Sequence, residues 1–191
     1  MRAIAERAGA SLGSSYHYFP SKEHLVLEFY RHTHRLHLEA IRPMLERETD
    51  LAARLRGTVR AVVVTCEPFH GFAGAIFSTV ANPASPLNPF GAESKALRDE
   101  VIALYAEVVK GSDTRVAPDI MAELPMLLWL YQMGILYFWI WDRSPGHLRT
   151  LDVIDQTTDL IVRLLGLANL PVLRGPRKRT LALIRRIAEG A

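Results

Sequence analysis

The chain has 191 residues, of which 49% are hydrophobic and 23% charged, which is typical of a folded protein of one or two domains and excludes disorder as its main state. Its one cysteine, Cys66, excludes an internal disulfide and a CxxC-type zinc site, and favours a reducing cytoplasm. The formal charge of +3 is unevenly placed, because residues 170–191 carry six basic residues and one acidic residue. The high isoelectric point therefore comes from the tail and does not by itself indicate nucleic-acid binding.

Apolar residues recur at helical spacing between breaks at glycine and proline, which predicts an all-α fold. The expected helices cover residues 2–8, 12–18, 22–47, 50–66, 72–81, 92–110, 119–142, 146–167 and 178–188. The Pro/Asn/Ser-rich segment 82–89 should be an irregular loop between layers of the bundle. Residues 1–9 do not resemble a signal peptide. We expect a head at 1–45, a larger helical body at 46–170 and a basic tail at 171–191.

The first two predicted helices have the features of a helix-turn-helix. Ile4, Ala5 and Ala8 give the first helix a small apolar face. Gly9 supplies a left-handed residue to end that helix, and Ser11 is placed to cap the next one. Two short helices joined in this way place the second in the major groove of DNA.

The second helix has side chains suited to contact with DNA. Residues 13–15 are a glycine and two serines, which keep the surface flat, and residues 16–18 offer hydroxyl, imidazole and ring contacts. Phe19 is expected to anchor the helix to the core. Ser21 should cap the following helix, which leaves Lys22 in the first turn, where the lysine and free backbone N–H groups can share one phosphate. The alternative is a solvated corner of a helical bundle.

The run IAERAGASLGSSYHYFPSKEHL, residues 4–25, resembles the DNA-binding signature of the tetracycline-repressor (TetR) family of bacterial transcriptional regulators. The matching positions are Ile4, Ala5, Ala8, Gly9, Gly13, Tyr16, Phe19, Lys22 and Leu25. The resemblance implies base-facing positions at Arg2, Ser11, Gly13, Ser14 and His17, and phosphate contacts at Tyr16, Tyr18 and Lys22.

The head departs from the family pattern in two ways. Ser15 stands where the family usually has an apolar residue. The family also has a further helix before this motif, so we expect an N-terminally truncated head, an incomplete three-helix unit that lacks a packing partner.

The resemblance also implies a function for the whole chain. It would be a ligand-responsive DNA-binding regulator, most simply a repressor, that releases a palindromic operator when a small apolar or aromatic effector binds the body. It would act as a homodimer without a cofactor and outside the membrane. The alternative is a dimeric small-molecule-binding protein that has lost DNA binding.

A narrow apolar seam in the last body helix is the predicted dimer interface. It consists of Leu151, Ile154, Thr158, Ile161 and Leu165. Together with the apolar helix at 119–142, this seam is similar to the two-helix contribution that each TetR subunit makes to a four-helix dimer interface. Asp152, Asp155 and Asp159 lie off the seam and are expected on a solvated face.

An apolar cavity inside the body is the predicted effector site. The candidate lining residues are Cys66, Phe69, Phe72, Phe77, Tyr105, Trp129, Tyr131, Met133 and Tyr137. The simpler interpretation of each of these residues is plain core.

Other interpretations are open for several segments. Residues 124–141 are nearly long enough to span a membrane, but their acidic flanks and Gln132 favour the buried centre of a bundle. The spacing of His24, Glu28 and His32 would allow a shared metal, but it is more typical of a hydrated helix face. No catalytic motif is present, so we do not expect an enzyme. The tail after Pro171 is expected to be mobile and solvated, or else docked on the dimer or attracted to DNA.

Overall fold

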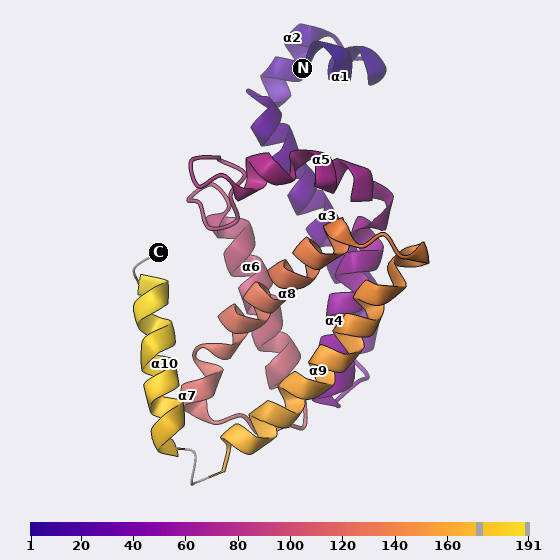
Figure 1. Cartoon of the computed structure of the whole chain (residues 1–191). Coiled ribbons are helices and arrows are strands. Elements are labelled where there is room, and N and C mark those ends of the chain that lie inside the picture. The colour runs from indigo at the N-terminus through magenta and orange to yellow at the C-terminus, as the bar shows by residue number, and fades with distance from the viewer. Residues whose placement is uncertain (171–173, 190–191) are drawn as a thin grey trace.

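The computed structural model describes residues 1–170 and 174–189, with their side chains except at 174, 178 and 184–189. Within these residues all regular elements are helical, as the apolar spacing predicts. The α-helices are α1 (Arg2–Arg7), α2 (Leu12–Tyr18), α3 (Lys22–Leu45), α4 (Leu51–Cys66), α5 (His70–Ala81), α6 (Lys95–Lys110), α7 (Pro118–Met121), α8 (Leu124–Trp141), α9 (Leu148–Ala168) and α10 (Arg174–Glu189), with 3-10 turns η1 (Glu67–Phe69) and η2 (Pro145–His147). The head, α1 and α2, projects from one end of the body on the first turns of α3 (Figure 1).

Several predicted helix boundaries differ from the structure, for example α6, which begins at Lys95 rather than at residue 92. The predicted helix at 119–142 is divided, because Ala122 and Glu123 form a turn between α7 and α8. The predicted break at Pro68 is only the 3-10 turn η1, so α5 begins at His70 rather than at residue 72. The tail helix includes residues from Arg174 on, rather than from residue 178, and Pro176 is tolerated in its first turn, where a missing N–H breaks no helical hydrogen bond.

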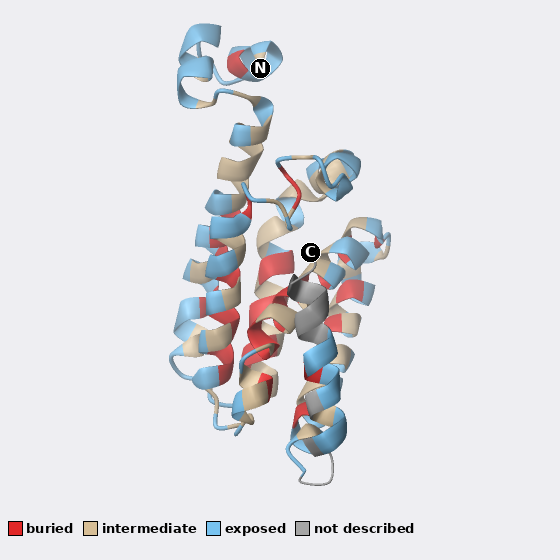
Figure 2. Ribbon diagram, turned by 90° about the vertical axis from the view of Figure 1, so that its left-hand side faces the viewer, coloured by how far each residue is buried: buried red, intermediate tan, exposed pale blue. Residues whose placement is uncertain are grey.

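The body packs around α4, which lies between α3, α6 and α9. Leu51, Leu55 and Val59 on α4 are at most 1% exposed, and Tyr105 of α6 and Ile154 of α9 are fully buried. Buried positions follow the inward faces of the body helices, whereas the head is almost entirely exposed (Figure 2). In α1 and α2 only Ala5 is buried, so the core that stabilises this chain belongs to the body.

Among the residues that the structure describes, two helical stretches, Leu51–Ala81 and α8, are long and apolar enough to cross a membrane by length and composition alone. In this structure α8 is a core helix, because Leu128, Trp129 and Trp139 are each 2% exposed. The buried-centre interpretation of residues 124–141 therefore fits the packing.

A buried arginine joins three helices of the body. Arg54 on α4 is 4% exposed, and it donates hydrogen bonds to the carbonyl oxygens of Leu45 and Glu48 at 2.6 Å. It also donates to the carbonyl oxygens of Val108 at 2.8 Å and Glu107 at 3.1 Å. These carbonyls lie in or just after the last turns of α3 and α6, where the helix dipole favours a cation. Those of Leu45, Glu48 and Val108 have no other hydrogen-bond partner among the described residues, whereas that of Glu107 also accepts from the Gly111 N–H at 2.9 Å.

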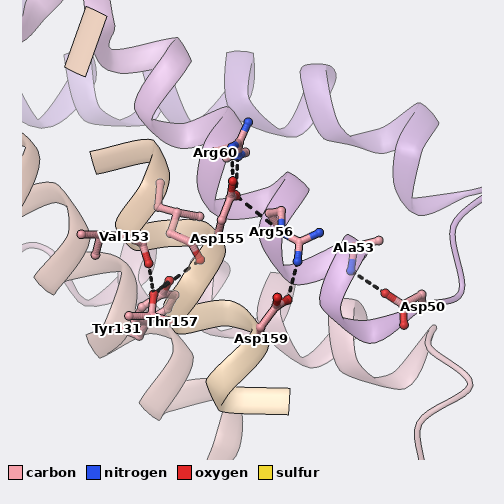
Figure 3. A network of polar contacts seen from close by, with 10 residues as sticks. Asp50, Ala53, Arg56, Arg60, Tyr131, Val153, Asp155, Thr157 and Asp159 are labelled. Atoms are coloured by element: carbon pink, nitrogen blue, oxygen red, sulfur yellow. Dashed lines mark hydrogen bonds and ion pairs between the residues drawn. The ribbon is translucent and has the colours of Figure 1, made fainter. Parts of the chain in front are cut away.

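Two arginines of α4 pair with two aspartates of α9 (Figure 3). Arg60 donates to Asp155 through both Nε, at 2.8 Å, and Nη2, and Arg56 pairs with Asp159 and lies 3.5 Å from Asp155. Asp155 and Asp159 are therefore ion-paired, while their side chains stay 38% and 49% exposed, so the expected solvated face is only partly correct for them. The sequence pattern gave their position on the helix but could not reveal the arginines opposite them.

The seam predicted as a dimer interface packs inside the subunit instead. Ile154 and Thr158 are fully buried and Leu165 is 8% exposed, so none of the three is available to a second chain. Leu151 and Ile161 are partly buried against the same core. The interface assignment is thus wrong for the buried residues, because the 3-4 spacing describes a stripe that contacts the subunit's own helices.

The first part of the tail helix is docked on the body. Arg177 donates to a carboxylate oxygen of Asp119 in α7 at 3.0 Å and to the carbonyl oxygen of Ala168 at 2.8 Å. Leu181 is 8% exposed. The expectation of a solvated tail is wrong for this part of the helix. The predicted start of the tail at Pro171 and the side chains of Arg185 and Arg186 lie outside the described residues.

Candidate nucleic-acid interface and ligand cavity

The turn between α1 and α2 has the predicted caps. Gly9 has φ +65°, the left-handed conformation that favours glycine, and it ends α1. The Ser11 hydroxyl accepts a hydrogen bond from the Ser14 N–H at 3.0 Å. Both predictions are confirmed, and these two residues fix the direction in which α2 leaves the turn.

The start of α3 is capped by Ser21. Its hydroxyl accepts a hydrogen bond from the His24 N–H at 3.4 Å and lies 2.9 Å from the Nδ1 of the same residue. Lys22 is exposed in the first turn, as the sequence predicts. The first turn of a helix presents free N–H groups beside this cation, which is a suitable arrangement for one phosphate.

All residues predicted to contact DNA are exposed and lie at the free end of the molecule (Figure 2). They are Arg2, Ser11, Gly13, Ser14, Tyr16, His17, Tyr18 and Lys22. Tyr18 is 72% exposed and Tyr16 50%. These hydroxyls are therefore free to contact a phosphate, and they lie on α2, just before Lys22 in the chain.

The residues considered for a metal on α3 have other partners. Glu28 forms ion pairs with Arg31 and Arg35, at 3.5 and 3.7 Å. His32 lies 3.5 Å from a guanidinium nitrogen of Arg35. In the described part of the chain no group of three or more His, Cys, Asp or Glu residues is arranged to hold a metal ion.

A cavity of about 260 Å³ lies in the body between α3, α4, α5, α6 and α8. Six of the predicted residues line it: Cys66, Phe69, Phe72, Phe77, Trp129 and Met133. Leu87 and Pro89 of the proline-rich loop contribute to its wall, as expected for a loop between layers. Four of the predicted aromatic residues, Phe69, Phe72, Phe77 and Trp129, thus converge on one space.

Three of the predicted lining residues lie elsewhere. Tyr105 is buried behind the wall and donates a hydrogen bond to Gln132 at 2.8 Å. The hydroxyl of Tyr131 lies 2.7 Å from that of Thr157, between α8 and α9. Tyr137 is 52% exposed and packs on the outer side of Phe77.

One wall of the cavity was missed at the sequence level. It comes from α3, through Phe29, Tyr30, Thr33, His34 and His37. Phe29 packs edge-to-face against Phe69 and Phe72 at ring-centroid distances of 4.7 and 5.3 Å. The spacing of residues 30, 33, 34 and 37 places them on one face of α3, and this periodicity is the sequence signal from which the wall can be predicted.

Burial keeps three titratable groups of the cavity wall neutral. Burial raises the pKa of the Cys66 thiol to about 11 and that of Tyr30 to about 12. Burial lowers the pKa of His37 to about 4, against a hydrogen bond from its Nε2–H to the Thr58 carbonyl oxygen at 2.9 Å. His37 therefore carries a lone pair on Nδ1 at neutral pH.

The neutral His37 predicts a loss of stability in mild acid. The unfolded chain has a histidine pKa of about 6.5, so it binds the proton more readily than the folded chain as the pH falls from 6.5 towards 4. Between pH 7 and pH 5 this difference in proton binding should lower the free energy of unfolding by about 2 kcal/mol. Urea unfolding of the wild type and His37→Gln at both pH values measures this cost. Equal losses in the two proteins would show that another group is responsible.

Comparison with known families agrees with this geometry. Residues 1–29, which hold the head, match the family model described as bacterial regulatory proteins, tetR family. Residues 54–175, which hold most of the body, match the model described as tetracyclin repressor-like, C-terminal domain. No curated protein matches the chain. The two family models together cover both parts of the structure, and the chain belongs to the TetR family of DNA-binding transcriptional regulators.

Proposed function

We propose that this chain is a ligand-responsive repressor that leaves its operator when a small molecule fills the cavity of the body. The observation that carries the proposal is the continuity of α3. This single helix runs from Lys22 in the head to Leu45 in the body, and its middle turns form one wall of the cavity. A ligand that displaces this wall also displaces the head.

The part of α3 between the cavity and the head is long enough to turn a small tilt into a displacement of the head. Lys22 lies twelve residues from His34, which at the helical rise is roughly 18 Å. A tilt of about 10° at the cavity would therefore move the start of α3 by roughly 3 Å. Two heads that must enter successive major grooves tolerate little change in separation, so a ligand that prefers the tilted state lowers the affinity for DNA.

A second copy of the chain is the proposed partner, through the outward faces of α8 and α9. These helices lie side by side on the near face of the body in Figure 1. They expose large apolar side chains, namely Tyr137, Phe138, Trp141, Leu148, Leu160, Leu164 and Leu167. Such a surface is typical of a subunit interface, and homodimers are usual in this family. A two-fold dimer would suit a palindromic operator.

One observation favours the alternative, a dimeric ligand-binding protein without DNA binding. The head buries only Ala5, and Ile4 and Leu12 are 45% and 38% exposed. A head with so small a core has little to hold α2 in one orientation. In either case we propose a cytoplasmic, non-enzymatic protein that needs no cofactor.

DNA binding should depend on Lys22 and Tyr16. Anisotropy of a fluorescent duplex from the region flanking its own gene, at 50 and 200 mM salt, measures the affinity. Lys22→Ala should weaken binding about fivefold to tenfold at low salt, because one phosphate contact is lost, and should reduce the salt dependence by about one ion. Tyr16→Ala should have a similar effect on affinity. Lys110→Ala, an exposed lysine at the end of α6, is the matched control and should bind as the wild type does.

The outcomes separate the candidate functions. Binding that survives both head substitutions would show that the contact assignment is wrong. Specific binding only by a form of the chain extended upstream would support the repressor and show that the head needs a further segment. Absence of binding by both forms, combined with ligand binding by the body, would favour the alternative.

A further inference from the structure

The cavity wall contains one permanent charge. Arg98 on α6 lines the cavity, and its Nη1 donates to the carbonyl oxygens of Pro89 at 2.7 Å and Gly91 at 3.1 Å. These bonds fix the guanidinium against the proline-rich loop. Its Nε and Nη2 make no hydrogen bond among the described residues, so donors remain for a ligand.

No described carboxylate neutralises this guanidinium. None lies within ion-pair distance of Arg98. Of the nearby acids, Asp99 is paired with Lys95, Glu100 faces α3, and Glu93 is exposed. The residues that line the cavity include no aspartate or glutamate. An apolar space with an unpaired arginine in its wall has a positive potential that favours an anion.

A second donor in the wall also lacks a partner. Gln132 lines the cavity and is 4% exposed. Its Oε1 accepts the hydrogen bond of the Tyr105 hydroxyl, which fixes the amide, and its Nε2 has no hydrogen-bond partner among the described residues. Gln132 Nε2 is not among the buried atoms that lack a partner, so this nitrogen is open to the cavity and available to a ligand acceptor.

From these groups we propose that the effector is a small carboxylic acid, bound as its anion, with an apolar body in the cavity and the carboxylate at Arg98. This inference rests on the proposed function and specifies its ligand. A cavity of 150 Å³ holds one benzene ring, so about 260 Å³ accommodates roughly ten carbon atoms, the size of two fused aromatic rings. The aromatic walls, with Phe29, Phe69 and Phe72 edge-to-face, suit such a body.

The carboxylate also explains how binding would reach the loop. Arg98 already holds the backbone of Pro89 and Gly91, so a ligand that engages its remaining donors ties α6, the loop and itself together. Charge-assisted hydrogen bonds to a guanidinium are about twice as strong as neutral ones. A neutral molecule of the same shape would fill the cavity but would make no such bond.

Titration calorimetry with two ligands of matched shape tests the proposal on the full chain. The probes are 2-naphthoate and the neutral 2-naphthamide, and the variants are Arg98→Gln and, as a control, the exposed Arg42→Gln. The wild type and Arg42→Gln should bind the acid at least tenfold more tightly than the amide. Arg98→Gln should bring this ratio to about one, while binding of the amide reports that the cavity is still formed.

Each result has a defined meaning. A wild type that binds acid and amide equally well, or an Arg98→Gln variant that keeps the tenfold ratio, would overturn the ligand class and leave the repressor proposal standing. Binding of neither probe would also overturn it. Whether the proposed function itself fails is decided separately, by adding the bound probe to the protein–DNA complex and measuring anisotropy.

Discussion

Replacement of Arg54 by methionine should lower the free energy of unfolding by about 3 kcal/mol. The guanidinium is 4% exposed and satisfies four backbone carbonyl oxygens. Methionine keeps much of the packing but donates no hydrogen bond, so the carbonyls of Leu45, Glu48 and Val108 lose their partner. For a chain of this length the loss corresponds to a melting temperature lower by about 6–12 °C.

The control for this prediction is Arg42→Met. Arg42 is an exposed arginine on α3, so its replacement should change the free energy of unfolding by no more than about 0.5 kcal/mol. Urea unfolding followed by circular dichroism measures both variants. If Arg54→Met were as stable as Arg42→Met, water would be replacing the guanidinium at these carbonyls. Arg54 would then not be what holds α3 and α6 to α4.

Local rules predicted much of the fold. The caps at Ser11 and Ser21 and the left-handed Gly9 follow from the preferences of single residues, and all three are observed. Arg54 could not be predicted in this way, because its partners are carbonyls of Leu45 and Val108 that only the tertiary fold brings together. Its sequence context resembles that of an ordinary surface arginine.

The candidate sites were predictable to different degrees. The head motif is contiguous, so its residues were assigned from one short run. The cavity is assembled from helices far apart in the chain, and composition identified its aromatic residues on α5 and α8 but not the wall from α3 or the charge at Arg98. Composition also cannot tell which of two neighbouring aromatic residues lines a cavity. Phe77 and Tyr137 are in contact, but only Phe77 faces the cavity.

The α9 helix carries two apolar stripes, and sequence spacing alone could not rank them. One stripe includes Ile154 and Thr158 and packs on the subunit's own core. The other, Leu160, Leu164 and Leu167, repeats at intervals of four and three and is more than half exposed. Both satisfy the helical period, and only the position of α4 shows which one is free for a second chain.

Replacement of Leu164 by glutamate should therefore convert a dimer into a monomer. Leu164 is 53% exposed in the middle of the free stripe, and a carboxylate buried there without a partner would cost several kcal/mol of association. Light scattering after size exclusion should give twice the 21.4 kDa chain mass for the wild type and the single chain mass for the variant. Affinity for a palindromic duplex should fall about 100-fold, because one head alone holds one half-site.

Leu36→Glu is the matched control for this experiment. Leu36 is 38% exposed on α3, away from the α8 and α9 face, so the variant should stay dimeric. A wild type of single chain mass at micromolar concentration would contradict the dimer itself. A dimeric Leu164→Glu would instead move the interface to another surface, since a charge added to this stripe would then remain in water. Both results bear directly on the proposed repressor mechanism, because only a dimer joined through the body would couple the cavity to the spacing of two heads.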